Sequence, residues 1–269
     1  MANPNLPSLL LTVFLVTTAG CGAVATPSEP STTDAPLSPT PSSSDANSGE
    51  RARLAPGLTE AGVTDAWALA QAHRDTLANG TYLEQTDHSV HANGTHLRNL
   101  STTLQRGHDD RYIYELHVDG TQVSSPRNVT VVRNDSTLVQ RTRYENGTVA
   151  YTGPENAITP PTDQYGNVYA VFTASNTTVE TTVEQHGQTR YRLTSVGAPF
   201  ESSAYAGVDD YEMSALVGPD GLVHEYHLSY QTTHDGRTVT VTIDCQFTNV
   251  GESIARPLEW ILDQEDEAE

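Results

Sequence analysis

The stretch Arg237–Phe247 alternates apolar and polar side chains without a break, and it limits the fold more than any other feature. Its apolar positions are Val239, Val241, Ile243, Cys245 and Phe247, and its polar positions are Thr238, Thr240, Thr242, Asp244 and Gln246. A period of two indicates a β-strand with one buried face and one wet face. The chain therefore has to build a sheet whose two sides meet different surroundings.

Turn sequences extend this strand into an antiparallel meander. His234-Asp235-Gly236 turns it back onto 222–230, and Pro219-Asp220-Gly221 turns that stretch back onto 211–217. Glycine after Asp is a common hairpin signal because it adopts a positive φ without strain. Further strands are predicted at 111–118, 178–185 and 189–195.

Two helices are predicted among these strands. Thr64 is a suitable N-cap for a helix in which Ala66, Leu69, Ala70, His73 and Leu77 follow helical spacing. Asn79-Gly80 is a stop signal. A second, shorter helix is predicted at 163–174, capped by Thr162, with Val168, Tyr169 and Phe172 facing the sheet. Amphipathic strands mixed with a few helices indicate an α+β fold.

The N-terminal residues predict export and lipidation. An uncharged apolar run, 9–16, is followed by Thr18-Ala19-Gly20 and then Cys21. An apolar run ending in small residues is typical of a secretory signal, and a cysteine directly after it resembles a lipoprotein box. We expect a signal peptide at 1–20, a lipid-modified Cys21, and a location on the extracellular face of the cell membrane. The alternatives are a plain signal peptide cleaved near Ala19, or a misassigned start that has lost basic residues.

The chain divides by composition after Cys21. Residues 21–57 are rich in Ser, Thr and Pro and poor in large apolar side chains, so they are predicted to form a disordered linker. Residues 58–262 are long enough for a single domain, and 263–269 form an acidic tail.

The net charge limits the classes of partner that the chain can bind. The 269 residues include 34 acidic and 14 basic ones, all of the latter arginine, and the net charge is −20. Self-repulsion at this charge is largely screened at molar salt, and abundant carboxylates without lysine are typical of haloarchaeal proteins. A surface this acidic argues against nucleic acid as a partner.

Short motifs resemble a family of uncharacterised haloarchaeal lipoproteins. They are Ala55-Pro56-Gly57-Leu58-Thr59, Gly62-Val63-Thr64-Asp65, Ala70-Gln71-Ala72-His73, Pro219-Asp220-Gly221-Leu222, Phe247-Thr248-Asn249-Val250-Gly251 and Pro257-Leu258-Glu259-Trp260. The order of elements distantly resembles the LolA/LprG-type envelope lipoproteins. That resemblance implies a curved antiparallel sheet, or half-barrel, that wraps one or two helices and encloses a cavity for a lipid.

A ligand would contact the apolar face of the C-terminal strands. The candidate residues are Tyr226, Leu228, Val239, Val241, Ile243 and Phe247. The sequence leaves open whether these side chains line a cavity or fill a core. The first hypothesis is therefore a carrier of a hydrophobic or lipid ligand. The second is a cell-surface module that binds proteins or glycans through a filled domain.

Asn-x-Ser/Thr motifs predict glycosylation of an exported chain. Of seven such motifs, Asn93, Asn134 and Asn146 lie in turn-like contexts and are the better candidates.

No pattern of residues predicts an enzyme, a cofactor or a metal site. His88, His91 and His96 cluster, and His224 lies three residues from His227, but neither group has the spacing of a zinc site. Cys245 belongs to the apolar positions of its strand, which indicates a buried side chain rather than a nucleophile.

Overall fold

The computed structural model describes residues 52–78, 80–121, 127–134, 137–185 and 187–252. In chain order, the strands and helices are β1 (Arg53–Ala55), β2 (Leu58–Thr59), β3 (Gly62–Val63), α1 (Ala66–Ala78), β4 (Tyr82–Ala92), β5 (Thr95–Arg106), β6 (Tyr112–Asp119), β7 (Asn128–Asn134), β8 (Thr137–Arg143), β9 (Val149–Thr152), α2 (Tyr165–Thr173), β10 (Thr178–Gln185), β11 (Gln188–Val196), β12 (Asp209–Val217), β13 (Val223–His234) and β14 (Arg237–Thr248).

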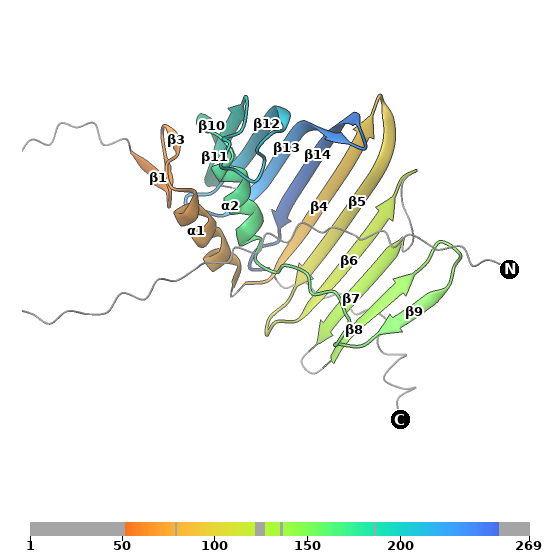
Figure 1. Ribbon diagram of the computed structural model, residues 1–269. Helices are drawn as coiled ribbons and strands as arrows, with labels where there is room; N and C mark the ends of the chain where they lie inside the picture. The colour runs from red at the N-terminus through yellow and green to blue at the C-terminus, as the bar shows by residue number, and fades with distance from the viewer. Residues whose placement is uncertain (1–51, 79, 122–126, 135–136, 186, 253–269) are drawn as a thin grey trace, which may run out of the picture. The chain divides into compact units, whose positions relative to one another are not determined.

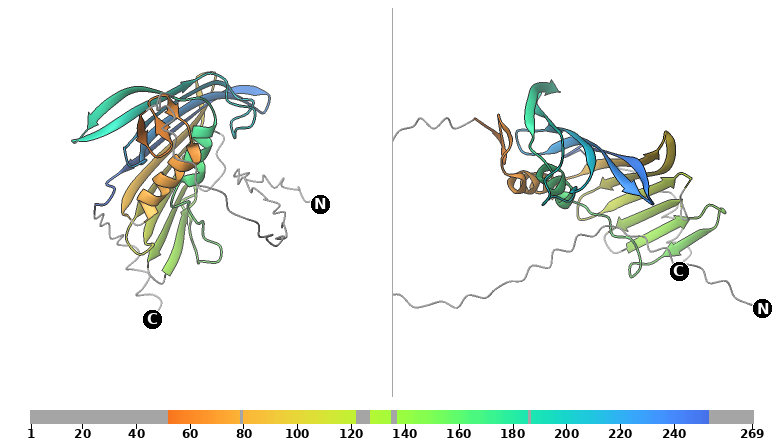
Figure 2. Two further views of the ribbon diagram at one scale, coloured as in Figure 1. Left: turned by 90° about the vertical axis from the view of Figure 1, so that its left-hand side faces the viewer. Right: turned by 45° about the horizontal axis from the view of Figure 1, so that its top comes forward.

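One antiparallel sheet of 11 strands dominates the fold, in the order β10-β11-β12-β13-β14-β4-β5-β6-β7-β8-β9. The pairing of β14 with β4 is the one that joins segments distant in sequence, and it places the C-terminal meander beside the first long hairpin. The sheet does not close, since β10 and β9 remain its edges (Figure 1). Its β10–β11 end curls over the helices (Figure 2). The predicted α+β class, a curved antiparallel sheet packed on helices, is confirmed.

The alternation in β14 is confirmed except at its centre, where Thr242 and Ile243 are both partly exposed. Val239, Val241, Cys245 and Phe247 are buried, and Thr238, Thr240, Asp244 and Gln246 are exposed. β13 pairs with β14 in a regular register that sets Tyr226 opposite Cys245. Because the side chains alternate, every strand paired with β14 inherits the same two faces.

Helix α1 buries Leu69, Ala70, His73 and Leu77, which confirms the predicted helical face. The cap was assigned to the wrong residue, however. The Asp65 carboxylate accepts the Ala68 backbone N–H at 2.9 Å, which makes Asp65 the N-cap. Thr64 instead donates its hydroxyl to the Gly57 carbonyl, because the β3 turn directs its side chain away from the helix.

Helix α2 is shorter than predicted, and Thr162 does not cap it. Its N-cap is Gln164, in the left-handed region at φ 49° and without a side-chain cap. Val168 and Phe172 face the core as predicted, but Tyr169 is 40% exposed. Val171 is buried instead. At 3.6 residues per turn, positions 168, 171 and 172 share one face, while position 169 lies about 100° away from 168.

The end of the predicted disordered linker, as far as the structure describes it, is ordered. Arg53–Ala55 already forms β1 of a small three-stranded sheet, and Ala55 is buried in the core. Nearby, Gly221 has φ +88°, and a Cβ there would lie 2.6 Å from the Ala72 side chain. Glycine therefore lets the β12–β13 turn approach α1 closely.

Candidate functional site

The large sheet has an inner face, which carries the helices, and an outer face. One row of paired residues across the inner face runs Leu228, Ile243, His88, Leu100 and Val118. The neighbouring row of outer-face residues runs His227, Asp244, Asp87 and Ser101. Any apolar ligand of the sheet would meet the inner face.

All six residues predicted to contact a ligand lie on this inner face. Tyr226, Leu228 and Phe247 belong to the main hydrophobic core, and Val239 and Val241 belong to a smaller buried cluster with Ala92 and Leu97. Ile243 packs against both clusters and is the one of the six that remains partly exposed. The structure therefore brings the six together on one face and buries five of them.

Helix α1 covers the part of this face near Phe247. The His73 ring packs edge-on against Phe247 with centroids 4.8 Å apart, and its Nδ1 accepts the Val223 backbone N–H at 3.2 Å. Burial lowers the pKa of His73 to about 3, so the ring is neutral at physiological pH. Helix and sheet are thus joined by packing and one hydrogen bond.

The connection 153–164, between β9 and α2, crosses the lower part of the inner face (Figure 1). The Ile158 backbone N–H donates to Gln140 Oε1 at 2.8 Å, and Tyr82 donates its hydroxyl to the Thr162 carbonyl. Arg106 also donates to Thr162 at 3.3 Å. These contacts tie the connection to β8, β4 and β5, so it covers the residues beneath it.

Glu84 is a carboxyl buried under this connection, with 3% of its surface exposed. Its Oε1 accepts from Gln164 Nε2 at 2.7 Å and from the Thr86 hydroxyl at 3.2 Å, while Oε2 has no partner in the described chain. Burial raises the pKa of Glu84 to about 7. No motif in the sequence distinguished this glutamate from the exposed ones.

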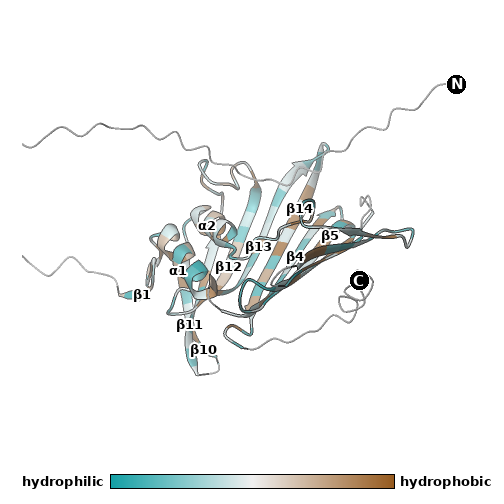
Figure 3. Ribbon diagram, turned by 90° about the horizontal axis from the view of Figure 1, so that it is seen from below, coloured by the Kyte–Doolittle hydropathy of each residue, from teal (hydrophilic) through white to brown (hydrophobic). Residues whose placement is uncertain are grey.

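Beyond the connection and the helices, part of the inner face stays partly exposed. We call this the open strip, and it consists of Val90, Leu100, Leu116, Val118 and Ile243. Leu100 and Val118 are paired neighbours on β5 and β6 and contact neither buried cluster. The strip lies on the central strands, where brown apolar positions interrupt the teal polar ones (Figure 3). It is an apolar surface without a cover among the described residues.

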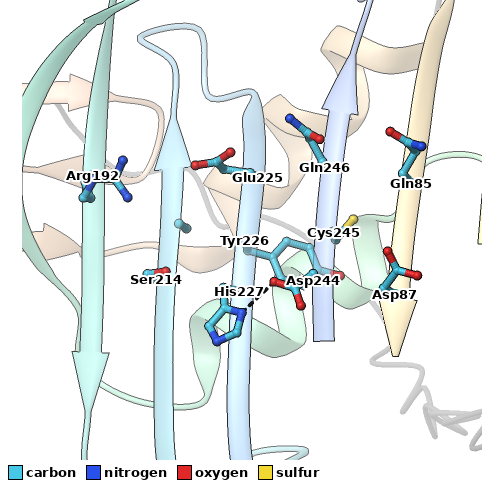
Figure 4. A pocket seen from close by; sticks show the side chains of 11 residues that line it. Gln85, Asp87, Arg192, Ser214, Glu225, Tyr226, His227, Asp244, Cys245 and Gln246 are labelled. Atoms are coloured by element: carbon cyan, nitrogen blue, oxygen red, sulfur yellow. Dashed lines mark hydrogen bonds and ion pairs between the residues drawn. The ribbon is translucent and has the colours of Figure 1, made fainter. Parts of the chain in front are cut away.

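The outer face carries an open polar groove of about 390 Å³. Gln85, Asp87, Glu225, His227, Asp244 and Gln246 project into it from β4, β13 and β14 (Figure 4). His227 Nδ1 lies 2.7 Å from Asp244 Oδ1, but both side chains are largely exposed. Such a pair contributes little to stability and leaves the groove accessible to polar partners.

The histidines that could suggest a metal site are distributed over different positions. The His91 and His96 rings lie 5.0 Å apart across the β4–β5 hairpin, while His88 belongs to the inner-face row. Within the described residues, no group of three or more His, Cys, Asp or Glu side chains is arranged to hold a metal ion. Neither α1 nor α2 is long and apolar enough to cross a membrane.

Cys245 is a buried core residue. It is 3% exposed, its Sγ accepts the Thr86 hydroxyl at 3.3 Å, and burial raises its pKa to about 12. A thiol in this state is a poor nucleophile. Cys21, the signal peptide and the acidic tail lie outside the described residues.

The three preferred glycosylation candidates are exposed in turns or at a strand end. Asn93 follows β4 with φ 49°, Asn134 ends β7, and Asn146 lies in the β8–β9 turn, where its side chain accepts the Thr148 backbone N–H at 2.9 Å. Their positions are accessible to a glycosylating enzyme.

Comparisons with known proteins give distant matches in structure alone. No family model and no curated protein matches the chain. LprF of Mycobacterium bovis is 12% identical, with a TM-score of 0.41, covering 72% of this chain and 96% of its own. The lipoprotein LppX of Mycobacterium tuberculosis is 8% identical, with a TM-score of 0.37, covering 71% and 97%.

A LolA superfamily protein of Nitrosomonas europaea is 5% identical, with a TM-score of 0.24, covering 71% of this chain and 94% of its own. These TM-scores all lie below 0.5, so the likenesses assign neither a family nor a ligand to this chain.

The sequence pattern did not identify the open strip. Its strand β4 carries Thr86 and His88 on the inner face, and β5 carries Arg98 and Thr102 there, so neither stretch alternates cleanly. Leu97, Leu100 and Leu104 are three and four residues apart, a spacing that fits a helix better than a strand, so this stretch gives no usable signal for the strip.

Proposed function

We propose that this chain is an exported lipoprotein that binds a hydrophobic or amphipathic molecule on the inner face of its sheet and has no enzymatic activity. The single observation that carries the proposal is the open strip, an apolar surface on the covered side of the sheet. The five side chains are partly exposed on one face, and apolar patches on soluble proteins often mark sites for a ligand, a partner or a membrane. Ile243 connects the strip to the predicted ligand residues Tyr226, Leu228, Val239, Val241 and Phe247, which support it from below.

The proposed location is the extracellular face of the cell membrane, with lipid on Cys21. It is supported by the apolar run and small residues before Cys21. One lipid chain alone gives only marginal membrane binding, so the anchor has to carry two chains or be helped by a second contact. We further propose that the charge of −20, without lysine, adapts the chain to high salt.

Mutation Cys21→Ser tests the anchor. We expect loss of the lipid-modified form, with release of the chain into the medium or retention as precursor, in cell fractionation and mass spectrometry. Unchanged membrane association and unchanged mass of the N-terminal peptide would contradict lipidation.

Native mass spectrometry of protein purified from high salt, followed by lipid extraction, tests ligand binding. A stoichiometric amount of co-purified or added lipid supports the proposal. A chain that takes up no lipid under any loading condition would overturn it.

A second candidate function is a cell-surface module that binds proteins or glycans. Two observations favour it: five of the six predicted ligand residues fill the core, and the outer face carries the polar groove beside His227 and Asp244. In that case, changes in the groove would abolish partner capture, and changes in the open strip would not.

A further inference from the structure

Two basic side chains extend from the same face as the open strip. Arg98 lies opposite Val90 and two residues before Leu100 on β5, and His88 lies opposite Leu100 on β4. Because side chains two residues apart share a face, both project beside Leu100. This register places the two side chains near each other, and burial, followed by the nearby charge of Arg98, lowers the pKa of His88.

Neither basic side chain has a hydrogen-bond or ion-pair partner among the described residues. Arg98 Nε and His88 Nε2 are buried atoms without an acceptor or donor. The nearest carboxyl on the inner face of β4 is Glu84, four residues from His88, which is about 13 Å along a strand. Buried polar groups left without a partner cost free energy, and a buried charge costs more.

This arrangement is unexpected in a chain with 34 acidic residues. Arg106 and Arg127, for comparison, each pair with carboxylates, Arg106 with Asp110 at 2.9 Å and Arg127 with Asp119 at 2.9 Å. An unpaired cation beside an apolar strip is the complement of an anionic amphiphile. A neutral lipid would cover the strip and leave the guanidinium unsatisfied.

We propose that the open strip binds a lipid with an acidic headgroup, its acyl chain lying over Leu100 and Val118 and its headgroup oxygens accepting hydrogen bonds from Arg98. This inference rests on the proposed ligand-binding function. Arginine suits the role because its planar fork donates two parallel hydrogen bonds to a phosphate. His88, neutral at physiological pH, supplies a second hydrogen-bonding nitrogen next to it.

The net charge of the chain affects how the binding of an acidic lipid depends on salt. At low salt, a surface of −20 repels anionic ligands, and at molar salt that repulsion is largely screened. A short-range hydrogen-bonded pair between Arg98 and a phosphate survives screening better than long-range repulsion does, because the pair is partly buried. The preference for an acidic headgroup should therefore rise with salt rather than fall.

Lipid transfer from vesicles tests the proposal. The full chain with Cys21→Ser, so that no anchor competes, is incubated with vesicles of dioleoyl phosphatidylglycerol or of digalactosyl diacylglycerol, a neutral bilayer-forming lipid whose headgroup has no phosphate. Protein is separated from the vesicles, and bound lipid is counted by native mass spectrometry. We expect about tenfold tighter binding of phosphatidylglycerol, since hydrogen bonds to charged groups are worth about this much.

Variants assign the preference to one side chain. Arg98→Gln should remove the tenfold preference and leave binding of the phosphate-free galactolipid unchanged, and Arg98→Lys should keep part of it. The matched control is Arg143→Gln, at an exposed position of β8 outside the strip, which should bind both lipids as the parent chain does. Circular dichroism and thermal unfolding check that each variant folds.

The possible negative results distinguish the headgroup site from the proposed ligand-binding function. Equal binding of the two lipids by the parent chain, or an unchanged preference in Arg98→Gln, would overturn the headgroup site while the ligand-binding proposal stands. Binding of neither lipid would overturn the proposed function itself. If Arg98→Gln does not fold, the ratio of the two lipids on the parent chain decides.

Discussion

The inner face of the sheet has two regions that differ in what lies above them. Around Tyr82, Glu84, Tyr226, Leu228 and Phe247, side chains from α1, α2 and the connection 153–164 complete a packed core. Along the open strip, the same face and the same strands end in partly exposed apolar side chains. A single sheet thus provides a rigid scaffold in one region and an accessible apolar surface in the other, and the difference comes from the cover rather than the strands.

The difference between the two regions is tested most directly by the same leucine-to-alanine substitution in each. Leu228 and Leu100 lie in the same inner-face row, but Leu228 is 0% exposed and Leu100 is partly exposed. We expect Leu228→Ala to lower the free energy of unfolding by about 2–5 kcal/mol, because it leaves a cavity in packed surroundings. Leu100→Ala should cost less than about 1 kcal/mol, since water or neighbours can fill the space. Denaturant unfolding measures both; equal losses would contradict the division.

Burial of Glu84 in the covered region should make the stability of the chain depend on pH. Its carboxyl has a pKa raised to about 7 in the folded chain against an ordinary value of 4.5. The folded state therefore binds this proton more tightly than the unfolded state, so stability is highest at low pH and falls as pH rises from about 4.5 to 7. A shift of this size corresponds to about 3 kcal/mol.

Mutation Glu84→Gln should remove that fall. The variant is expected to match the parent near pH 4.5 and to exceed it by up to about 3 kcal/mol at pH 8, measured by urea unfolding across the pH range. Asp87→Asn, on the exposed outer face of the same strand, is the control and should leave the slope in place. A parallel pH dependence in Glu84→Gln and the parent would show that Glu84 is solvated.

The smallest expected effect concerns the cover itself. Asp65→Ala removes the N-cap of α1 and should cost about 1 kcal/mol of stability, as caps usually do. Thr64→Ala should cost less, since its hydroxyl contacts the Gly57 carbonyl at the limit of hydrogen-bond distance, 3.5 Å. If ligand binding by Asp65→Ala stays at the level of the parent, the helix supports the core and does not form the binding surface.

Sequence reasoning predicted the elements whose own pattern is complete. Apolar and polar residues alternate along β14, and α1 repeats Leu69, His73 and Leu77 at helical spacing. The buried face of each element can therefore be predicted from its own sequence. The predictions failed where a neighbouring segment determines which way a side chain points. Thr64 and Asp65 are both good caps, and only the β3 turn determines which one faces the helix.

The open strip could not be predicted for the same reason. Leu100 and Val118 are apolar residues on strands with polar neighbours, and their exposure depends on which parts of the assembled sheet other elements cover, which no local pattern encodes. Likewise, Glu84 differs from the exposed glutamates through its burial under the connection 153–164, which includes its partner Gln164, 80 residues further along the chain. Depth of burial is a property of the assembled sheet rather than of its strands.

The most direct test of the central claim places a carboxylate on each side of the sheet and counts bound lipid. Leu100→Asp adds a charge to the open strip, and Thr240→Asp adds one at an exposed position on the outer face of β14. After loading from vesicles, native mass spectrometry should show at least a tenfold loss of bound lipid for Leu100→Asp and none for Thr240→Asp. Equal lipid on both variants would contradict the assignment of ligand binding to the inner face.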